Sequence, residues 1–439
     1  MIHLANVLLA ASDQAFAADL LGRLEQGGYK VRLATSGAEA IEAARREDPD
    51  IAILGPSLAD MDLAGLAEAL KTDRATADMP VFLIVEKATP AFLTRALDLG
   101  VDDVMDKNFD EHVLLARLRP LGRLATMHSE LHHRVEVANR FGISCSDEVA
   151  RPTLESGYAL LLVGRDLGDV AAIVGGECDL TTTDNLFEAQ DLLTARNFDA
   201  AVLVPSGNSE EYLALCGQIR NNPRLFNLPV VLAGDPGSFD PIEAYRRGAS
   251  RVLLRPLQAA AVHSGVVSLV RRQRLRWEIR VALTHTSTAA SRDPLTGLYN
   301  RDFMTAHLER RIEAARASNR HLTVIFFSIP NVDGVREHFG DESADHLAQQ
   351  LGQWITGLLR VEDLTARYQA NEFAVILPDT PLDEAEIVMH RIAGVITYTD
   401  FAVKDVYQPV KVWVAVGSAQ LEEGETTEAL IARARRNLD

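Results

Sequence analysis

Short, continuous apolar runs recur through the first 255 or so residues, and segments with helical periodicity separate them. The runs fall at residues 7–10, 51–54 and 81–85, and again at 160–163, 200–204 and 230–233. Continuous apolar runs of this length are typical of parallel strands that crossover helices bury on both faces. The pattern therefore predicts two successive doubly wound α/β domains.

The two α/β regions also share landmarks in the same order. Asp50 precedes one apolar run and Asp199 precedes its counterpart, 149 positions later, while Pro80 and Pro229 open the next pair of runs. A fixed offset between similar segments indicates an internal repeat. We therefore interpret the first part of the chain as a duplication.

The pattern changes after about residue 285. A helical segment is followed by the strand LTVIFFSI, a helix, a strand pair split by a turn at 369–371, a further helix and the strand VKVWVAVG. This order predicts an α+β domain built on a mixed or antiparallel sheet. The predicted domains are 1–140, 155–280 and 285–439.

Two helical segments connect these domains. The first covers 111–141, with an expected interruption at Pro120. The second lies near 269–290 and reads as a solvated linker helix, because it carries four arginines at positions expected to be exposed: Arg271, Arg272, Arg274 and Arg276.

The composition of the chain argues against several classes of function. The chain has 62 acidic and 44 basic residues among 439, a net charge of −18, which argues against nucleic acid or an anionic membrane as a partner. Three widely spaced cysteines predict neither a disulfide framework nor a zinc site. No run approaches the roughly 18 apolar residues of a membrane span. We therefore expect a cytoplasmic protein that is neither exported nor inserted in a membrane.

The first α/β region resembles the receiver domain of two-component response regulators, with Lys107 at the place of the family's phosphate-sensing lysine. The resemblance implies that the two tandem α/β domains have the flavodoxin-like (CheY-like) fold. The resemblance implies an acidic pair after the first strand, an aspartate nucleophile after the third and a hydroxyl after the fourth. These positions hold Ala11 and Ser12, Gly55, and Val85. We therefore expect no phosphorylation there, and Asp13 and Asp60 are poor substitutes.

The second α/β region resembles a receiver domain that also lacks the residues needed for phosphorylation. Its equivalent positions hold Gly164 and Arg165, Val204, and Arg255. We expect both receiver-like domains to act as interaction or dimerisation surfaces, which makes a homodimer the expected assembly.

The C-terminal region resembles the GGDEF domain of diguanylate cyclases. The sharpest match is Asp293-Pro294-Leu295-Thr296-Gly297-Leu298-Tyr299-Asn300-Arg301, supported by Arg367-Tyr368 and Glu372-Phe373 on either side of the turn. Two receivers followed by a GGDEF domain is the layout of PleD-type response regulators and of their degenerate, PopA-like relatives.

The resemblance implies a cyclase site that this sequence lacks. Ser328 and Asn371 stand where cyclases hold Mg²⁺ with carboxylates, and neither replaces an ionised carboxylate as a ligand. Asp333 takes the place of a phosphate-binding lysine and Arg336 that of a guanine-binding asparagine. Asp345 and Glu372 retain the residues that cyclases have at these positions. We therefore expect no catalytic residue, no bound metal, no required cofactor and no enzyme activity.

One binding motif of the family is complete. Arg360-Val361-Glu362-Asp363 matches the RxxD motif of the inhibitory site at which cyclases bind cyclic di-GMP, and Arg391 aligns with a further basic residue of that site. An arginine fork can bind the O6 and N7 edge of guanine, and a carboxylate can accept its N1 and N2 hydrogens. A chance RxxD that forms a surface ion pair is the alternative.

These observations lead to a hypothesis of a cyclic di-GMP receptor built on an inactive cyclase. The resemblance further implies recruitment of protein partners, as an adaptor or in delivery of a substrate to a protease, in bacterial cell-cycle control at the cell pole. The alternatives are a residual diguanylate cyclase and a ligand-independent scaffold. His128, His132 and His133 are expected to form a polar helix face rather than a metal site.

Overall fold

The computed structural model describes residues 4–149, 157–176, 178–222, 224–404 and 406–438. The chain divides into two compact units. The N-terminal unit comprises residues 4–125 and 150–278, and the C-terminal unit comprises residues 126–149 and 279–439. The domain bounds 1–140, 155–280 and 285–439 remain a prediction, and the compact units divide the chain differently.

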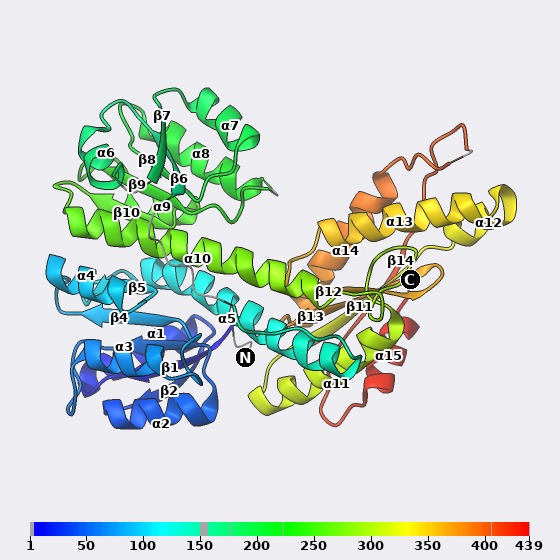
Figure 1. The fold of residues 1–439 in the computed structure, drawn as a ribbon, viewed down its shortest axis with the longest axis horizontal. Helices are drawn as coiled ribbons and strands as arrows, with labels where there is room; N and C mark the ends of the chain where they lie inside the picture. Colours follow the sequence, from blue (N-terminus) through cyan, green and yellow to red (C-terminus); the bar gives the residue numbers. More distant parts are fainter. Residues whose placement is uncertain (1–3, 150–156, 177, 223, 405, 439) are drawn as a thin grey trace. The chain divides into compact units, whose positions relative to one another are not determined.

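The first sheet of the N-terminal unit is five-stranded and parallel, in the order β2-β1-β3-β4-β5 (Figure 1). Its strands are β1 (Asn6–Ala10), β2 (Lys30–Ala34), β3 (Ile51–Leu54), β4 (Val81–Val85) and β5 (Asp103–Asp106). The helices between them are α1 (Gln14–Gln26), α2 (Gly37–Glu47), α3 (Leu63–Thr72) and α4 (Pro90–Asp98). Alternate residues of β1 enter two different apolar clusters, Leu8 in one and Leu9 in the other. Both faces of the sheet are therefore buried, as the continuous apolar runs predict.

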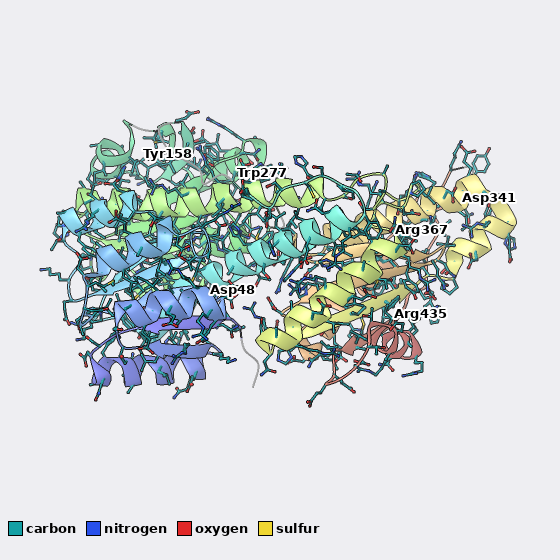
Figure 2. All side chains as sticks on the ribbon, turned by 60° about the horizontal axis from the view of Figure 1, so that its bottom comes forward. Asp48, Tyr158, Trp277, Asp341, Arg367 and Arg435 are labelled. Atoms are coloured by element: carbon teal, nitrogen blue, oxygen red, sulfur yellow. The ribbon has the colours of Figure 1, made fainter. Side chains whose placement is uncertain are left out.

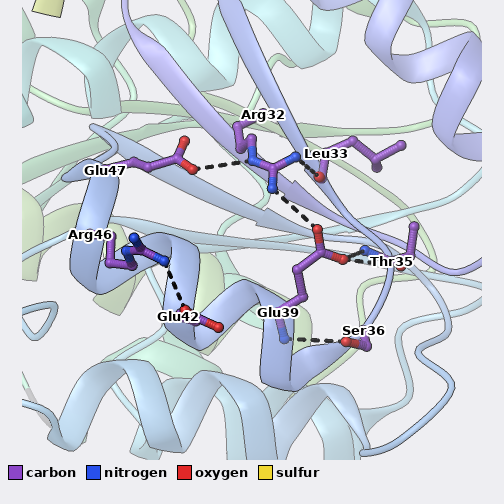
Figure 3. A network of polar contacts seen from close by, with 8 residues as sticks. All are labelled: Arg32, Leu33, Thr35, Ser36, Glu39, Glu42, Arg46 and Glu47. Atoms are coloured by element: carbon purple, nitrogen blue, oxygen red, sulfur yellow. Dashed lines mark hydrogen bonds and ion pairs between the residues drawn. The ribbon is translucent and has the colours of Figure 1, made fainter.

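Local capping explains where α2 begins. The Ser36 hydroxyl accepts a hydrogen bond from the Glu39 amide, and the Glu39 carboxylate accepts one from the Thr35 amide at 2.8 Å (Figure 3). This pattern is close to a capping box. Arg32 reaches Glu39 and Glu47 from β2, each at 3.3 Å, on an exposed surface. These pairs order the rim of the sheet and add little stability.

The second sheet repeats the first in strand order, β10-β9-β8-β6-β7, and is also parallel. Its strands are β6 (Tyr158–Val163), β7 (Cys178–Thr183), β8 (Ala200–Leu203), β9 (Val230–Gly234) and β10 (Arg251–Leu254). Its helices are α6 (Gly168–Val174), α7 (Leu186–Ala195), α8 (Ser209–Asn221), α9 (Pro241–Arg246) and α10 (Ala259–His285). The predicted pair of doubly wound α/β domains is confirmed as an architecture.

Within the N-terminal unit, a buried carboxylate of the first α/β domain binds one arginine from each of the two α/β domains. Asp103 of β5 is almost fully buried and accepts hydrogen bonds from Arg117 of α5 (Glu111–Arg140) and Arg251 of β10. The charge of Arg272, which is half-buried, also acts on Asp103. Burial alone would raise the pKa of Asp103, but the charges of these arginines hold that pKa well below its ordinary value.

The arginines of α10 correct the prediction of a solvated linker helix. Arg271 donates to the Leu97 carbonyl, Arg274 pairs with Asp199 at 3.2 Å, and Arg276 donates to Asn227. The same helix buries an apolar stripe, Val262, Val266, Val267, Leu269 and Val270, against the second sheet. These arginines are half-buried and their guanidinium groups reach polar partners, so the charge run does not form a solvated face.

The expected interruption at Pro120 is also wrong. Helix α5 runs without a break from Glu111 to Arg140 with Pro120 inside it. A proline removes one amide donor from the helical ladder. Here Leu118, Leu121 and Leu124 are buried on the neighbouring turns, and this packing retains the helix.

The C-terminal unit contains a four-stranded antiparallel sheet in the order β12-β13-β11-β14. Its strands are β11 (Leu322–Ser328), β12 (Leu364–Gln369), β13 (Glu372–Pro378) and β14 (Ala415–Gln420). Its helices are α11 (Arg301–Ser318), α12 (Asn331–Phe339), α13 (Asp341–Gly357), α14 (Leu382–Tyr398) and α15 (Thr427–Arg436). The predicted α+β domain is thus confirmed, with its last strand a few residues later than expected.

The end of α5 belongs to this second unit. Val137, Ala138 and Ile143 lie in the same apolar cluster as Tyr299 and Phe303. A helix that begins in the first α/β domain therefore ends inside the core of the α+β unit. Among the described residues, no helix is long and apolar enough to span a bilayer.

Candidate functional site

The carboxyl edge of the first sheet is where a receiver would be phosphorylated. Lys107 follows β5 there, and its ammonium lies 2.8 Å from Glu86 and 3.6 Å from Asp13. The hydrogen bond to Glu86 raises the pKa of Lys107. Asp13 is occupied as the N-cap of α1, accepting from the amides of Ala15 and Phe16. The lysine thus has carboxylate partners, but none stands at the expected acceptor position.

Position 55 is closed to a larger residue. A Cβ atom on Gly55 would lie 2.8 Å from the Ala11 Cβ and 3.1 Å from the Phe16 ring. Such an approach is shorter than real Cβ contacts, so an aspartate here would require its neighbours to move. Asp60, the other nearby carboxylate, caps the start of α2 through the amides of Gly37 and Ala38.

The turn between β12 and β13 corresponds to the catalytic turn of the cyclase fold. Asn371 donates to the Asp333 carboxylate at 2.6 Å, and Arg336 pairs with the same carboxylate at 2.9 Å. Ser328 lies opposite Glu372 in the register of β11 and β13. Asn371 and Arg336 thus share the Asp333 carboxylate as their partner.

The surviving carboxylate of this turn is already paired. Arg435 of α15 contacts Glu372 at 3.0 Å, and Arg367 of β12 lies 3.3 Å from Asp293; both arginines are labelled in Figure 2. Pairing with Glu372 raises the pKa of Arg435. Within the described part of the chain, no cluster of three or more His, Cys, Asp or Glu side chains is arranged to hold a metal ion.

The RxxD segment forms a tight turn between α13 and β12. The Asp363 carboxylate accepts from the Arg360 amide at 2.8 Å, and the Asp363 amide donates to the Arg360 carbonyl at 3.2 Å. Arg391 of α14 donates to the Leu358 carbonyl at 3.0 Å, next to the same turn. The structure therefore brings together Arg360, Asp363 and Arg391. Arg360 and Arg391 are exposed, whereas Asp363 is only 9% exposed.

A buried ionic network supports this turn from inside the C-terminal unit. Glu130 of α5 is fully buried and contacts three cationic or titratable side chains, Arg134 at 2.6 Å, His307 at 2.9 Å and Arg311 at 3.6 Å. Burial would raise the pKa of Glu130, but these neighbours hold the pKa well below its ordinary value. Arg134 also donates to the Glu362 carbonyl at 2.8 Å.

The three histidines of α5 do not share one environment. His132 is exposed and contacts Asp147 at 2.5 Å, whereas His133 is buried. Burial, with help from Arg311, lowers the pKa of His133 to about 3, so the ring is neutral at physiological pH. The expectation of a polar face therefore fails for His133.

Sequence reasoning missed Glu130, Arg134, His307 and Arg311. The i, i+4 spacing of Glu130 and Arg134 was visible, but such pairs usually lie on exposed helix faces. Their burial depends on α11, which is distant in the sequence. The burial of Glu130 and Arg134 is seen only in the contacts that α5 makes with α11 in the folded chain.

Two family models match the chain. The model described as "Response regulator receiver domain" matches residues 7–119, and the one described as "Diguanylate cyclase, GGDEF domain" matches residues 290–439. The second α/β domain lies outside both matched ranges.

Similar proteins cover different shares of the chain. Response regulator PleD of Caulobacter vibrioides is 27% identical over 434 residues, which is 98% of this chain and 95% of PleD. Diguanylate cyclase DgcP of Pseudomonas aeruginosa is 28% identical over 146 residues, 33% of this chain and 22% of DgcP. Among solved structures, the GGDEF domain of DgcB from Caulobacter crescentus in complex with c-di-GMP matches with a TM-score of 0.33 at 21% identity, covering 34% of this chain and 85% of that one.

Proposed function

From the premise that this chain is a PleD-like response regulator with a receiver domain and a GGDEF domain, we propose that it is a receptor for cyclic di-GMP built on an inactive cyclase. The observation that carries this proposal is that Arg360 and Asp363 form one turn and that Arg391 of α14 binds the Leu358 carbonyl next to it. Two exposed guanidinium groups beside a rigid turn suit a ligand with guanine bases and phosphates.

The same domain supports the proposal of lost catalysis. Two-metal phosphoryl transfer needs ionised carboxylates where Ser328 and Asn371 stand. Asn371 and Arg336 instead engage Asp333, and Arg435 engages Glu372. A nucleoside triphosphate and Mg²⁺ would have to displace these pairs without gaining the carboxylate ligands that drive metal binding.

The proposed output is recruitment of protein partners. A ligand that binds one arrangement of the chain more tightly than another shifts the population toward it. The second α/β domain, as a degenerate receiver, would supply partner and homodimer surfaces. In PopA-like fashion, the proposed role is adaptor or protease-substrate delivery in the bacterial cell cycle, in the cytoplasm and at the cell pole.

Calorimetric titration of cyclic di-GMP into the full chain tests the receptor directly. We expect saturable binding by the wild type and a loss of at least tenfold in affinity in Arg360→Ala, because one charge-assisted contact contributes roughly 1.5 to 3 kcal/mol. Arg436→Ala, another exposed arginine of the same unit, is the control and should bind as the wild type does. Absence of binding by the wild type would leave the ligand-independent scaffold.

Incubation with GTP and Mg²⁺ tests the lost catalysis. We expect no cyclic di-GMP above that in a protein-free sample over several hours, measured by chromatography, since both metal-ligand positions lack a carboxylate. An active diguanylate cyclase assayed in parallel shows that the conditions permit turnover. Accumulation of product that depends on protein concentration would establish the residual cyclase instead.

A further inference from the structure

Arg134 connects a helix that starts in the receiver domain to the RxxD turn. Its side chain is 4% exposed, and one terminal nitrogen donates to the backbone carbonyl of Glu362 at 2.8 Å. Glu362 lies between Arg360 and Asp363 but is not one of the motif's defining residues. The contact therefore acts on the backbone of the motif from the side opposite to solvent.

The position of this hydrogen bond matters for the turn. The Glu362 carbonyl and the Asp363 amide belong to one planar peptide group. Arg134 binds the carbonyl end of that group, and the amide end donates to the Arg360 carbonyl at 3.2 Å. Arg134 thus fixes the orientation of the peptide that sets the spacing of Arg360 and Asp363.

Arg134 is itself held in place. Its Nε donates to Glu130 at 2.6 Å, and its guanidinium lies 5.7 Å from the centre of the Tyr299 ring. Glu130 in turn contacts His307 and is fully buried. Arg134 holds the carboxylate and the backbone carbonyl through two different nitrogens of one planar group. A lysine presents all its donors from a single nitrogen, so it cannot reproduce both contacts in the same positions unless its partners move.

We propose that Arg134 is a positioning residue for the cyclic dinucleotide site, holding the Arg360–Asp363 turn in its binding geometry through the Glu362 carbonyl. The inference deepens the proposed receptor function and rests on it. Helix α5 is continuous from Glu111 to Arg140, so the turn's geometry depends on a helix that also forms part of the receiver domain. By linkage, ligand bound at the turn stabilises the docked end of α5.

The test compares Arg134→Lys with Arg310→Lys in the full chain. Arg310 of α11 pairs with Glu136 of α5 at 2.6 Å and with Glu313 at 3.4 Å rather than with the turn, so it is the control. Lysine at 134 retains the buried charge opposite Glu130, which protects the fold. Two measurements are made: hydrogen exchange of the peptide covering 358–364 without ligand, and calorimetric titration with cyclic di-GMP.

We expect Arg134→Lys to speed exchange in the 358–364 peptide severalfold and to weaken cyclic di-GMP about tenfold, with a thermal midpoint close to that of Arg310→Lys. Arg310→Lys should leave exchange and affinity at wild-type values. Unchanged exchange in Arg134→Lys, or equal losses in both variants, would overturn the positioning role. If the wild type binds no cyclic di-GMP, the receptor proposal fails, while the exchange comparison still decides whether Arg134 orders the turn.

Discussion

Replacing Asp103 with alanine is expected to destabilise the N-terminal unit by about 3 to 5 kcal/mol, the cost typical of removing one partner from a buried ion pair. Asp103 is the carboxylate that Arg117 and Arg251 share, and the charge of the half-buried Arg272 also acts on it. The substitution would leave the guanidinium groups of Arg117 and Arg251 largely buried without their shared carboxylate. Their mutual repulsion adds to the lost attraction.

Urea denaturation followed by pulsed hydrogen exchange of peptides from β1 to β5 measures this loss. The control is Arg32→Ala, which removes the exposed pairs with Glu39 and Glu47 shown in Figure 3. Exposed pairs contribute about 0 to 1 kcal/mol, so this variant should unfold near the wild-type urea concentration. If Asp103→Ala unfolded together with Arg32→Ala, the buried carboxylate would not be a main determinant of stability.

The second large effect is expected in the C-terminal unit. Glu130→Gln retains the volume of the side chain but removes the negative charge shared by Arg134 and Arg311, and should destabilise this unit by about 3 to 5 kcal/mol. Glu136→Gln, on the same helix but partly exposed, is the matched control and should cost less than about 1 kcal/mol. Pulsed exchange of peptides from β11 to β13 separates the two variants. Equal urea midpoints for them would contradict the role of the buried network.

The difference in unfolding free energy between the wild type and Glu130→Gln is expected to change with pH in one direction. The pKa of Glu130 is lowered from its ordinary value of 4.5, so the folded state favours the ionised carboxylate. Its stabilising contribution is complete above about pH 4.5 and is lost as the pH falls below that value. The gap in unfolding free energy between wild type and Glu130→Gln should therefore stay constant from pH 7 to pH 5.5 and narrow in more acidic buffer. A gap that widened on acidification would contradict this assignment of charge.

Much of the fold followed from local patterns. Continuous apolar runs predicted parallel strands because both faces of each sheet are buried, as Leu8 and Leu9 show by entering different clusters. The course of α5 and α10 did not follow from the sequence. Pro120 is normally a helix breaker, and an arginine run is normally solvated, but packing on neighbouring turns outweighed both tendencies.

The residues of the candidate site also fall into two groups, those that the sequence predicts and those that only the structure shows. Ser328, Asn371, Arg360 and Asp363 were found because motifs fix their spacing, and Arg391 was found by its alignment with the family. The structure places Arg360 and Asp363 in one turn and Arg391 of α14 next to it. The network that supports this turn could not be found by spacing. Glu130 and His307 are 177 positions apart, and nothing local distinguishes a buried glutamate from the many exposed ones.

The distribution of the C-terminal unit along the chain affects how it is made during translation. Residues 126–149 leave the ribosome well before residues 279–439, with which they share one compact unit. Until β11 and α11 are synthesised, Val137, Ala138 and Ile143 lack the apolar partners that cover them. Apolar surface exposed in this way favours aggregation, and the same risk applies when the α+β region is expressed as a fragment. A fragment that starts at residue 285 would leave Tyr299 and Phe303 without part of their core, so fragments for biophysical work should retain the end of α5.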